Sequence, residues 1–335
     1  MTHVVLVYAL LSRILSVLCS VIPVIFFNTG VPGAIIGLTL ASFGSFLVGM
    51  RLLTLPFKDV TRRKTDLTTA DILRFSMPVF SSSLYGFVIG SASQFFVSRY
   101  LGVENFAMFA NGYRELPIAG IVIGAVAGIL LPEFSRMTKG GSDSKQYLVL
   151  WKNVVLKSAA VIYPFSLYCC IFAPEIMGVL YGTVYREAAD LFRIVTIINL
   201  VRIVPYGPIM FALGKGKIFA KAHLVTALLL LGLDFLCVTF FPSLSAIAII
   251  ATTTTVFCLV VLMVSTARLL NTGLSRLMPW KSMFKILSVS TFSCFLGSCV
   301  VNLIGVTRDF HGSSSFLPAV PPYRKRSVRG LYPIR

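Results

Sequence analysis

Residues 246–267 read AIAIIATTTTVFCLVVLMVSTA, a run of 22 residues without a charged side chain. A helix needs about 20 apolar residues to cross the hydrocarbon core of a bilayer. Similar runs recur along the whole chain, in which hydrophobic residues make up 56% and charged residues 13% of 335 positions. A soluble domain carries about a quarter charged residues. The composition therefore excludes a soluble fold and predicts a polytopic membrane protein.

The apolar runs predict helices, because backbone polar groups in lipid must be satisfied within their own segment. We expect an all-α polytopic membrane protein with about nine transmembrane helices. Their expected ranges are 4–26, 32–53, 71–98, 112–132, 152–174, 189–212, 220–241, 245–268 and 284–305. The seven cysteines fall inside these runs without CxxC spacing, which is typical of inert packing. We therefore predict neither a metal site nor a cofactor.

The net charge of +18 comes from basic residues that lie in short segments between the apolar runs. This pattern marks cytoplasmic loops, so it does not predict nucleic-acid binding. Two spans separate each basic cluster from the next, so all four are expected on the cytoplasmic side, with the N-terminus inside. The clusters are residues 51–74, 136–157, 215–221 and 268–285. We also expect a basic cytoplasmic linker at 54–70 and a disordered basic tail at 306–335.

Several motifs follow one another in an order that resembles a known family. Residues 71–102 read DILRFSMPVFSSSLYGFVIGSASQFFVSRYLG, followed by GYRELP at 112–117 and LLPEFSRM at 130–137. Further along come APEIMGVLYGTVYREAADLFRI at 173–194 and ALGKGK at 212–217. This order resembles the polysaccharide and O-antigen flippases of the multidrug/oligosaccharidyl-lipid/polysaccharide exporter superfamily.

The resemblance implies a MATE-like exporter fold, which has two bundles of six helices. Residues 1–53 would match the last two helices of the first bundle, 71–268 the second six-helix bundle, and 284–305 an extra helix. Because known members are longer, we expect a truncated member.

The implied function is a flippase that moves undecaprenyl-pyrophosphate-linked oligosaccharide across the bacterial inner membrane. The oligosaccharide would be an O-antigen or another surface-polysaccharide repeat unit. The implied partners are this lipid-linked oligosaccharide, the lipid bilayer and a polysaccharide polymerase.

Other functions stay open at this stage. They are a multidrug or other lipid-linked precursor exporter of the same superfamily, a membrane-embedded polysaccharide enzyme, and an inactive truncated remnant. Arginines in the spans disfavour export of cationic drugs. We do not predict an enzyme, because the three histidines are scattered and no paired acidic motif appears.

A pyrophosphate needs cations along a polar path that is sheltered from lipid. If 189–212 is one helix, four of its polar residues share about a third of the circumference. These are Thr196, Asn199, Arg202 and Tyr206. We expect Arg202, near the middle of the span, to meet the phosphates; the alternative is an ion pair with an acid on a neighbouring helix. Prolines that can bend helices are Pro78, Pro117, Pro205 and Pro208.

Other polar residues in or beside the spans are further candidates. Asp234 lies deep in its span and either takes up a proton or pairs with Arg202. Arg13 is a second candidate cation for the path, or its side chain snorkels to the membrane surface. Arg114 and Glu115 at the outer mouth either pair with each other or gate the path. Gln94 lies where relatives often carry an acid, so substrate contact is expected there instead of ion coupling.

Overall fold

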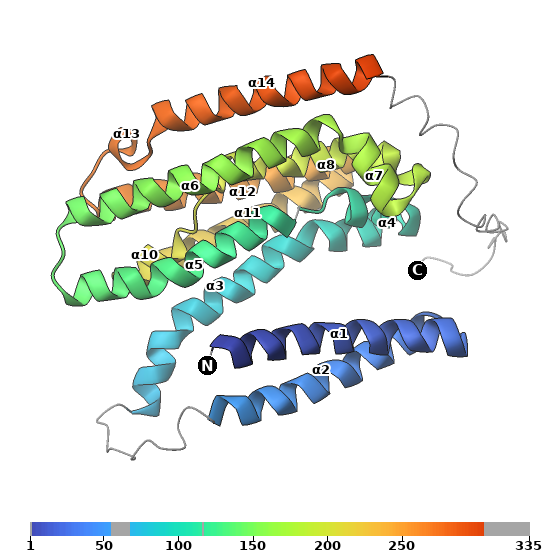
Figure 1. The fold of residues 1–335 in the computed structure, drawn as a ribbon, viewed down its shortest axis with the longest axis horizontal. Helices are drawn as coiled ribbons and strands as arrows, with labels where there is room; N and C mark the ends of the chain where they lie inside the picture. Colours follow the sequence, from blue (N-terminus) through green and yellow to red (C-terminus); the bar gives the residue numbers. More distant parts are fainter. Residues whose placement is uncertain (1, 55–67, 116, 305–335) are drawn as a thin grey trace. The chain divides into compact units, whose positions relative to one another are not determined.

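The computed structural model describes residues 2–54, 68–115 and 117–304, which form two compact units (Figure 1). Unit 1 is Met1–Thr68 and unit 2 is Thr69–Arg335. All regular structure in the described residues is helical, so the predicted all-α fold is confirmed. The predicted tail at 306–335 and most of the predicted linker at 54–70 lie outside the described residues.

Unit 1 is a hairpin of α1 (Thr2–Phe27) and α2 (Gly30–Thr54). Small residues recur at every fourth position of α2, which puts them in one row along the helix. They are Gly33, Gly37, Ala41, Ser45 and Gly49. A Cβ atom at Gly37 would lie 1.8 Å from the carbonyl oxygen of Cys19 on α1. Small residues let membrane helices approach closely, so this row sets how α1 and α2 pack.

Unit 2 contains the remaining helices. In chain order they are α3 (Thr69–Phe96), the π-helical turn η2 (Val97–Leu101), α4 (Val103–Gly112), α5 (Pro117–Lys139), α6 (Ser144–Ile171), α7 (Ala173–Tyr181), the 3₁₀ turn η3 (Thr183–Ala188), α8 (Ala189–Thr196), α9 (Ile198–Val201), α10 (Gly207–Ala212), α11 (Gly216–Phe240), α12 (Leu244–Leu269), α13 (Leu274–Leu277) and α14 (Trp280–Ile304). Helix α3 packs along α11, and α14 lies along α6 (Figure 1).

Eight helices in the described part of the chain are long and apolar enough to cross a membrane. They are α1, α2, α3, α5, α6, α11, α12 and α14. The predicted continuous helix at 189–212 is wrong. Instead a turn at Ile197 separates α8 from α9, and the chain then leaves the helix at Arg202 (φ −87°, ψ 68°) and becomes helical again at Gly207.

The break between α9 and α10 has a local cause in the sequence. Pro205 has no backbone N–H and disfavours a helical conformation at Val204. Pro208 lies in the first turn of α10, where a missing N–H costs nothing. The helical-wheel argument for one polar face over 189–212 therefore fails, because the positions from Arg202 onward are not on the same helix as Thr196.

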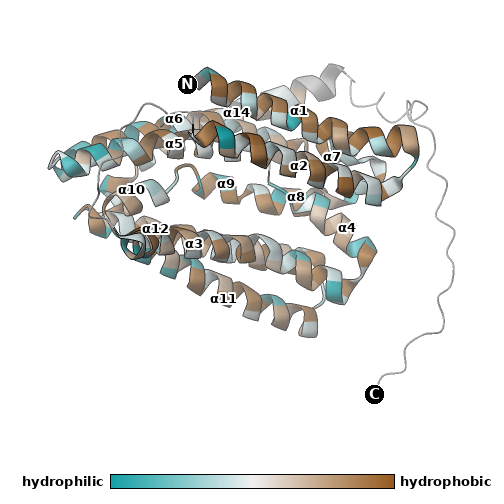
Figure 2. Cartoon of the chain, turned by 90° about the horizontal axis from the view of Figure 1, so that it is seen from below, coloured by the Kyte–Doolittle hydropathy of each residue, from teal (hydrophilic) through white to brown (hydrophobic). Residues whose placement is uncertain are grey.

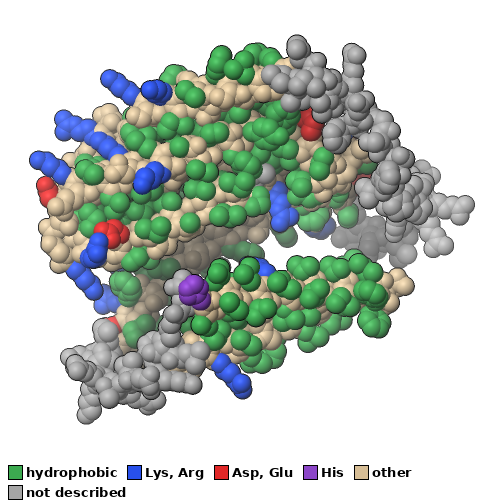
Figure 3. Space-filling model, in the orientation of Figure 1, with side chains coloured by type: hydrophobic (Ala, Val, Ile, Leu, Met, Phe, Trp, Pro, Cys, Tyr) green, Lys and Arg blue, Asp and Glu red, His purple; other side chains and the backbone are tan. Residues whose placement is uncertain are grey.

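The surface of the helices is apolar. Most of each span is brown in Figure 2, and the teal, hydrophilic residues gather mainly near helix ends. Large exposed side chains such as Phe87 and Phe284 point away from the core, as expected for helices that face lipid. On the face seen in Figure 3, Lys and Arg side chains gather at one end of unit 2, where α5 and α6 meet. The core of unit 2 is built around the fully buried Trp151, Phe109 and Phe134.

Candidate functional site

An ion pair joins the break in the α8–α10 segment to the junction between α4 and α5. The Nη2 atom of Arg202 donates to the carboxylate of Glu115. Their side chains keep 27% and 33% of their exposed surface, so the pair is only half-buried. The Nε atom of Arg202 is buried and has no partner among the described residues. Since guanidinium offers five N–H donors, Arg202 can bind a further acceptor while it holds Glu115.

Tyr113 connects this junction to α12. It caps the C-terminal end of α4, two residues before Glu115, and its ring stacks on Phe109 at 5.1 Å between centroids. Its hydroxyl shares a 2.9 Å hydrogen bond with the hydroxyl of Thr252. Both Glu115 and Asp234 lie within electrostatic range of this hydroxyl. Tyr113 therefore lies near both acids.

Asp234 lies on α11, where it has no exposed surface. The hydroxyl of Ser93 on α3 donates to its Oδ2 at 2.7 Å, while its Oδ1 has no partner among the described residues. A charge at this depth is costly unless it is paired or protonated. The acid that pairs with Arg202 is thus Glu115, and Asp234 has a neutral donor instead.

Three separate polar contacts in unit 2 join Arg202 to Glu115, Tyr113 to Thr252, and Ser93 to Asp234. We call these six residues together the polar line. Residues that lie next to its α3 and α12 members, or one helical turn from its α11 member, pack in one small cluster with Tyr113, which keeps these elements together. The cluster includes Ala92, Leu230 and Ala251. The polar line contains a partly exposed cation, Arg202, and a buried carboxyl group, that of Asp234. It therefore offers one group that can bind an anion and one that can bind a proton.

Three predicted residues of the broken segment lie in the core. Thr196 is buried, and its hydroxyl donates to the carbonyl of Phe192 at 2.7 Å. Asn199 is 1% exposed, and neither atom of its side-chain amide has a partner among the described residues. Tyr206 packs on Trp151 at 5.4 Å between ring centroids, and its buried hydroxyl also has no described partner. Unmet buried polar groups of this kind cost about 1–3 kcal/mol each.

The other predicted residues are more exposed. Gln94 follows Ser93 on α3 and is half-buried, and Arg114 is exposed beside Glu115. Arg13 belongs to unit 1, where it is exposed on α1. Their predicted roles stay predictions.

Sequence reasoning missed Ser93, Tyr113 and Thr252. A signal for Thr252 was present, since four consecutive threonines at 252–255 interrupt an otherwise apolar span. Ser93 and Tyr113 carried no such signal, because Ser and Tyr are common in membrane helices and at their ends. Their importance comes from partners 141 and 139 positions away in the chain.

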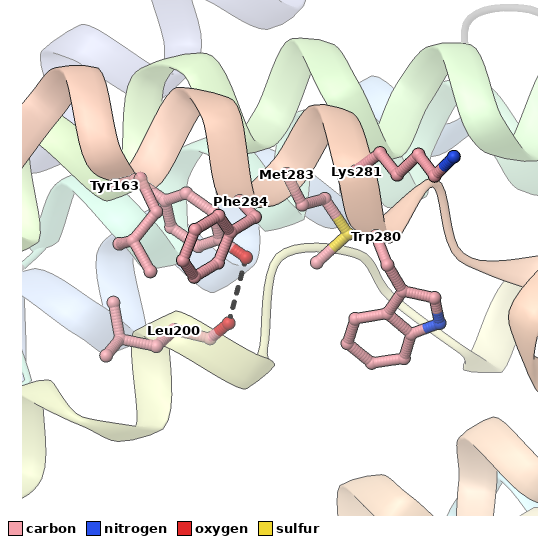
Figure 4. Close-up of a pocket in the computed structure, with 7 residues that line it drawn as sticks. Tyr163, Leu200, Trp280, Lys281, Met283 and Phe284 are labelled. Atoms are coloured by element: carbon pink, nitrogen blue, oxygen red, sulfur yellow. Dashed lines mark hydrogen bonds between the residues drawn. The ribbon is translucent and has the colours of Figure 1, made fainter.

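A separate apolar cavity of ≈ 640 Å³ lies where α6, α9 and α14 meet (Figure 4). It is lined by Tyr163, Leu200, Trp280, Lys281, Met283, Phe284 and Leu287. The hydroxyl of Tyr163 donates to the carbonyl of Leu200 at 3.1 Å, which ties α6 to α9. None of the predicted site residues lines this cavity. In the described residues no three His, Cys, Asp or Glu side chains are grouped so as to hold a metal ion.

Comparison with known proteins gives the family. The model of a family described as polysaccharide biosynthesis protein matches residues 2–190, more than half of the chain. The chain belongs to this family. No curated protein and no solved structure matches the chain.

In this polysaccharide biosynthesis protein the match runs from α1 to the start of α8. It includes Ser93, Tyr113 and Glu115 of the polar line and ends before Arg202. The coarse function, a role in polysaccharide biosynthesis by a multi-pass membrane protein, is therefore established from the family and the helices. The resemblance inferred from the motifs is confirmed at this level.

Proposed function

We propose that the chain is a flippase that translocates undecaprenyl-pyrophosphate-linked oligosaccharide, an O-antigen or other surface-polysaccharide repeat unit, across the bacterial inner membrane. One observation carries the proposal. An arginine lies at a helix break among apolar spans in a member of a polysaccharide biosynthesis family. Discontinuous helices in transporters commonly form the substrate site.

Pyrophosphate recognition would use Arg202. In the absence of substrate, Glu115 neutralises Arg202 and lowers the cost of holding a cation among the membrane spans. The substrate phosphates replace Glu115, or they bind the unpaired Nε donor beside it once a shift of the segment exposes this atom. Bidentate binding of phosphate oxygens is the strong form of this interaction. Arg13 supplies a second cation in this scheme.

Sugar recognition would use the broken segment and α3. The amide of Asn199 and the hydroxyl of Tyr206 have no described partners in this conformation. A shift of α8–α10 during alternating access exposes them, together with Thr196, to the sugar hydroxyls. Gln94 on α3 contacts the same glycan.

Coupling and gating would use the rest of the polar line. Asp234 takes up a proton, and loss of its charge changes the electrostatic field at Tyr113, two residues before Glu115. Arg114 and Glu115 then act as the gate at the outer mouth. The basic ends of the helices face the cytoplasm, the N-terminus is inside, and a polysaccharide polymerase takes the product outside. This scheme uses no cofactor and no nucleic acid.

The test is transport in proteoliposomes that contain the full chain and the lipid-linked oligosaccharide. A membrane-impermeant glycosidase added outside trims only glycans in the outer leaflet unless lipids flip. We expect trimming beyond the outer-leaflet pool with the native chain, and trimming confined to that pool with Arg202→Gln. If the native chain also gives trimming that is confined to the outer-leaflet pool, the proposal is contradicted. Cleavage of the lipid-linked sugar by the protein alone in detergent would indicate an enzyme instead.

A further inference from the structure

A second cavity lies at one end of unit 2, away from the polar line. It has a volume of ≈ 330 Å³ and is formed by the first three turns of α3, the end of α10 and the start of α11. Its apolar wall includes Phe75, Val79 and Phe211, and its polar rim is Asp71, Arg74 and Lys217. The three charged side chains are exposed.

The turn between α10 and α11 fixes the position of Lys217. Gly214 has a φ of +66°, a conformation that favours glycine. The amide of Lys215 donates to the carbonyl of Met210 at 2.7 Å, which closes the turn. A Cβ atom at Gly216 would lie 2.8 Å from the ring of Phe211, so a glycine is needed where the turn meets the aromatic wall. Lys217 follows directly, in the first turn of α11.

The cavity adjoins an exposed apolar face of α3. Ile72, Phe75 and Val79 are all exposed and, at positions i, i+3 and i+7, share one face of the helix. Two of them also line the cavity. Since α3 is one of the membrane spans, a molecule in this cavity would lie with its apolar part along this face. This favours a lipid over a soluble ion.

The charges of the rim specify the headgroup. Two cations attract a phosphate, while the carboxylate of Asp71 opposes a purely anionic ligand. A carboxylate accepts several hydrogen bonds, so Asp71 can accept from an ammonium in addition to its other contacts. A headgroup that carries both a phosphate and a primary ammonium complements all three side chains.

We propose that this cavity binds a phospholipid with a phosphoethanolamine headgroup, whose phosphate contacts Arg74 and Lys217 and whose ammonium contacts Asp71. One acyl chain lies along Ile72, Phe75 and Val79. The bound lipid stabilises the junction between α3, α10 and α11. None of the residues of this site belongs to the polar line.

The test is thermal unfolding of the purified full chain in detergent with added short-chain phospholipids. We expect phosphatidylethanolamine to raise the midpoint at lower concentration than phosphatidylcholine, whose quaternary ammonium has no N–H to donate. Arg74→Gln and Lys217→Gln should each weaken the binding of both lipids at least about tenfold, which corresponds to a loss of about 1.4 kcal/mol of binding free energy. Asp71→Asn should abolish the preference for phosphatidylethanolamine and leave phosphatidylcholine binding in place.

Lys285→Gln is the matched control, because it removes an exposed lysine of α14 that does not line the cavity. It should bind both lipids like the native chain. The proposal is overturned if the native chain does not prefer phosphatidylethanolamine, if phosphatidylglycerol binds more tightly, or if Lys285→Gln weakens binding as much as Lys217→Gln. It is also overturned if inorganic phosphate or glycerophosphoethanolamine alone gives the same stabilisation, because the acyl chain would then contribute nothing.

Discussion

At the scale of single residues, the site depends on charged residues whose partners differ in kind. Arg202 has an ionic partner in Glu115, whereas among the described residues the partner of Asp234 is the hydroxyl of Ser93. Removing one member of a buried pair leaves the other unpaired, which costs more than the pair itself contributes. Substitutions at Glu115 and at Asp234 can therefore test the roles of the two acids separately.

The first prediction concerns the ion pair. Arg202→Gln should lower the rate of flipping at least about tenfold, because a charge-assisted hydrogen bond contributes about 1.5–3 kcal/mol. Arg202→Lys should keep part of the activity, since the charge stays and the planar fork is lost. Glycan trimming in proteoliposomes measures both rates.

Two further variants decide what the pair does. Arg136→Gln breaks the exposed pair with Glu133 and should change transport little, since surface pairs contribute about 0–1 kcal/mol. If the double variant Arg202→Gln with Glu115→Gln recovers native transport, Arg202 serves only to neutralise Glu115 and has no role in substrate binding.

The second prediction concerns Asp234. In Asp234→Asn the amide oxygen still accepts from Ser93, so the fold should be kept while the ionisable group is lost. Transport should then no longer respond to an imposed proton gradient. Ser93→Ala should instead lower stability by about 1–3 kcal/mol, because it leaves the buried carboxyl without its donor. Full retention of the gradient response in Asp234→Asn would exclude this carboxyl from coupling.

At the scale of elements, the structure depends on the close packing of α1 against α2 and on the break in the helix between α9 and α10. The row of small residues on α2 brings two backbones together. The prolines at 205 and 208 do the opposite and keep α9 and α10 from joining into one helix.

The third prediction concerns the α1–α2 hairpin. Gly37→Leu should separate the two helices, because even a Cβ atom there would overlap the carbonyl oxygen of Cys19. Gly44→Leu is the control, since nothing lies within 4 Å of a Cβ atom at Gly44. Cross-linking of cysteines introduced at Tyr8 and Ser45, which are in contact by a 2.7 Å hydrogen bond, reports the packing in native membranes. Equal cross-linking in Gly37→Leu and Gly44→Leu would contradict the claim that Gly37 allows the close approach of α1 and α2.

At the scale of the whole molecule, charge distribution predicts the topology. Basic turns lie at the α5–α6 and α10–α11 connections. The segment α8–α10 lies between α6 and α11, so it must still cross the bilayer if both turns are cytoplasmic. Figure 1 agrees, since α8 lies beside α7 and α10 lies at the opposite end, beside α5.

The fourth prediction is that reporters fused after Gly140 and Lys217 report the cytoplasm and one fused after Val103 reports the periplasm. The prediction follows from the excess of Lys and Arg in cytoplasmic loops. Alkaline phosphatase and green fluorescent protein, which are active on opposite sides of the inner membrane, provide the measurement. Opposite results at two of the three sites would reverse the orientation.

Most of the fold could be predicted from the sequence, because span length and apolarity depend on local composition. Eight of nine predicted spans correspond to continuous helices. The ninth failed because Pro205 and Pro208 were read as bends, whereas together they stop the helix. The site was harder to predict. Arg202, Asp234 and Glu115 stand out as charges in or beside spans, but their partners lie 87 to 141 positions away and depend on tertiary packing.

The separation of Glu115 and Arg202 by 87 positions also has a consequence for synthesis. At about 5–20 residues per second, the ribosome needs about 4–17 s to reach Arg202 after Glu115 has been made. During this interval Glu115 exists without the arginine that pairs with it in the structure. We therefore expect Glu115 to stay in contact with water until α9 has been made, and α4 and α5 to take their final depth only then.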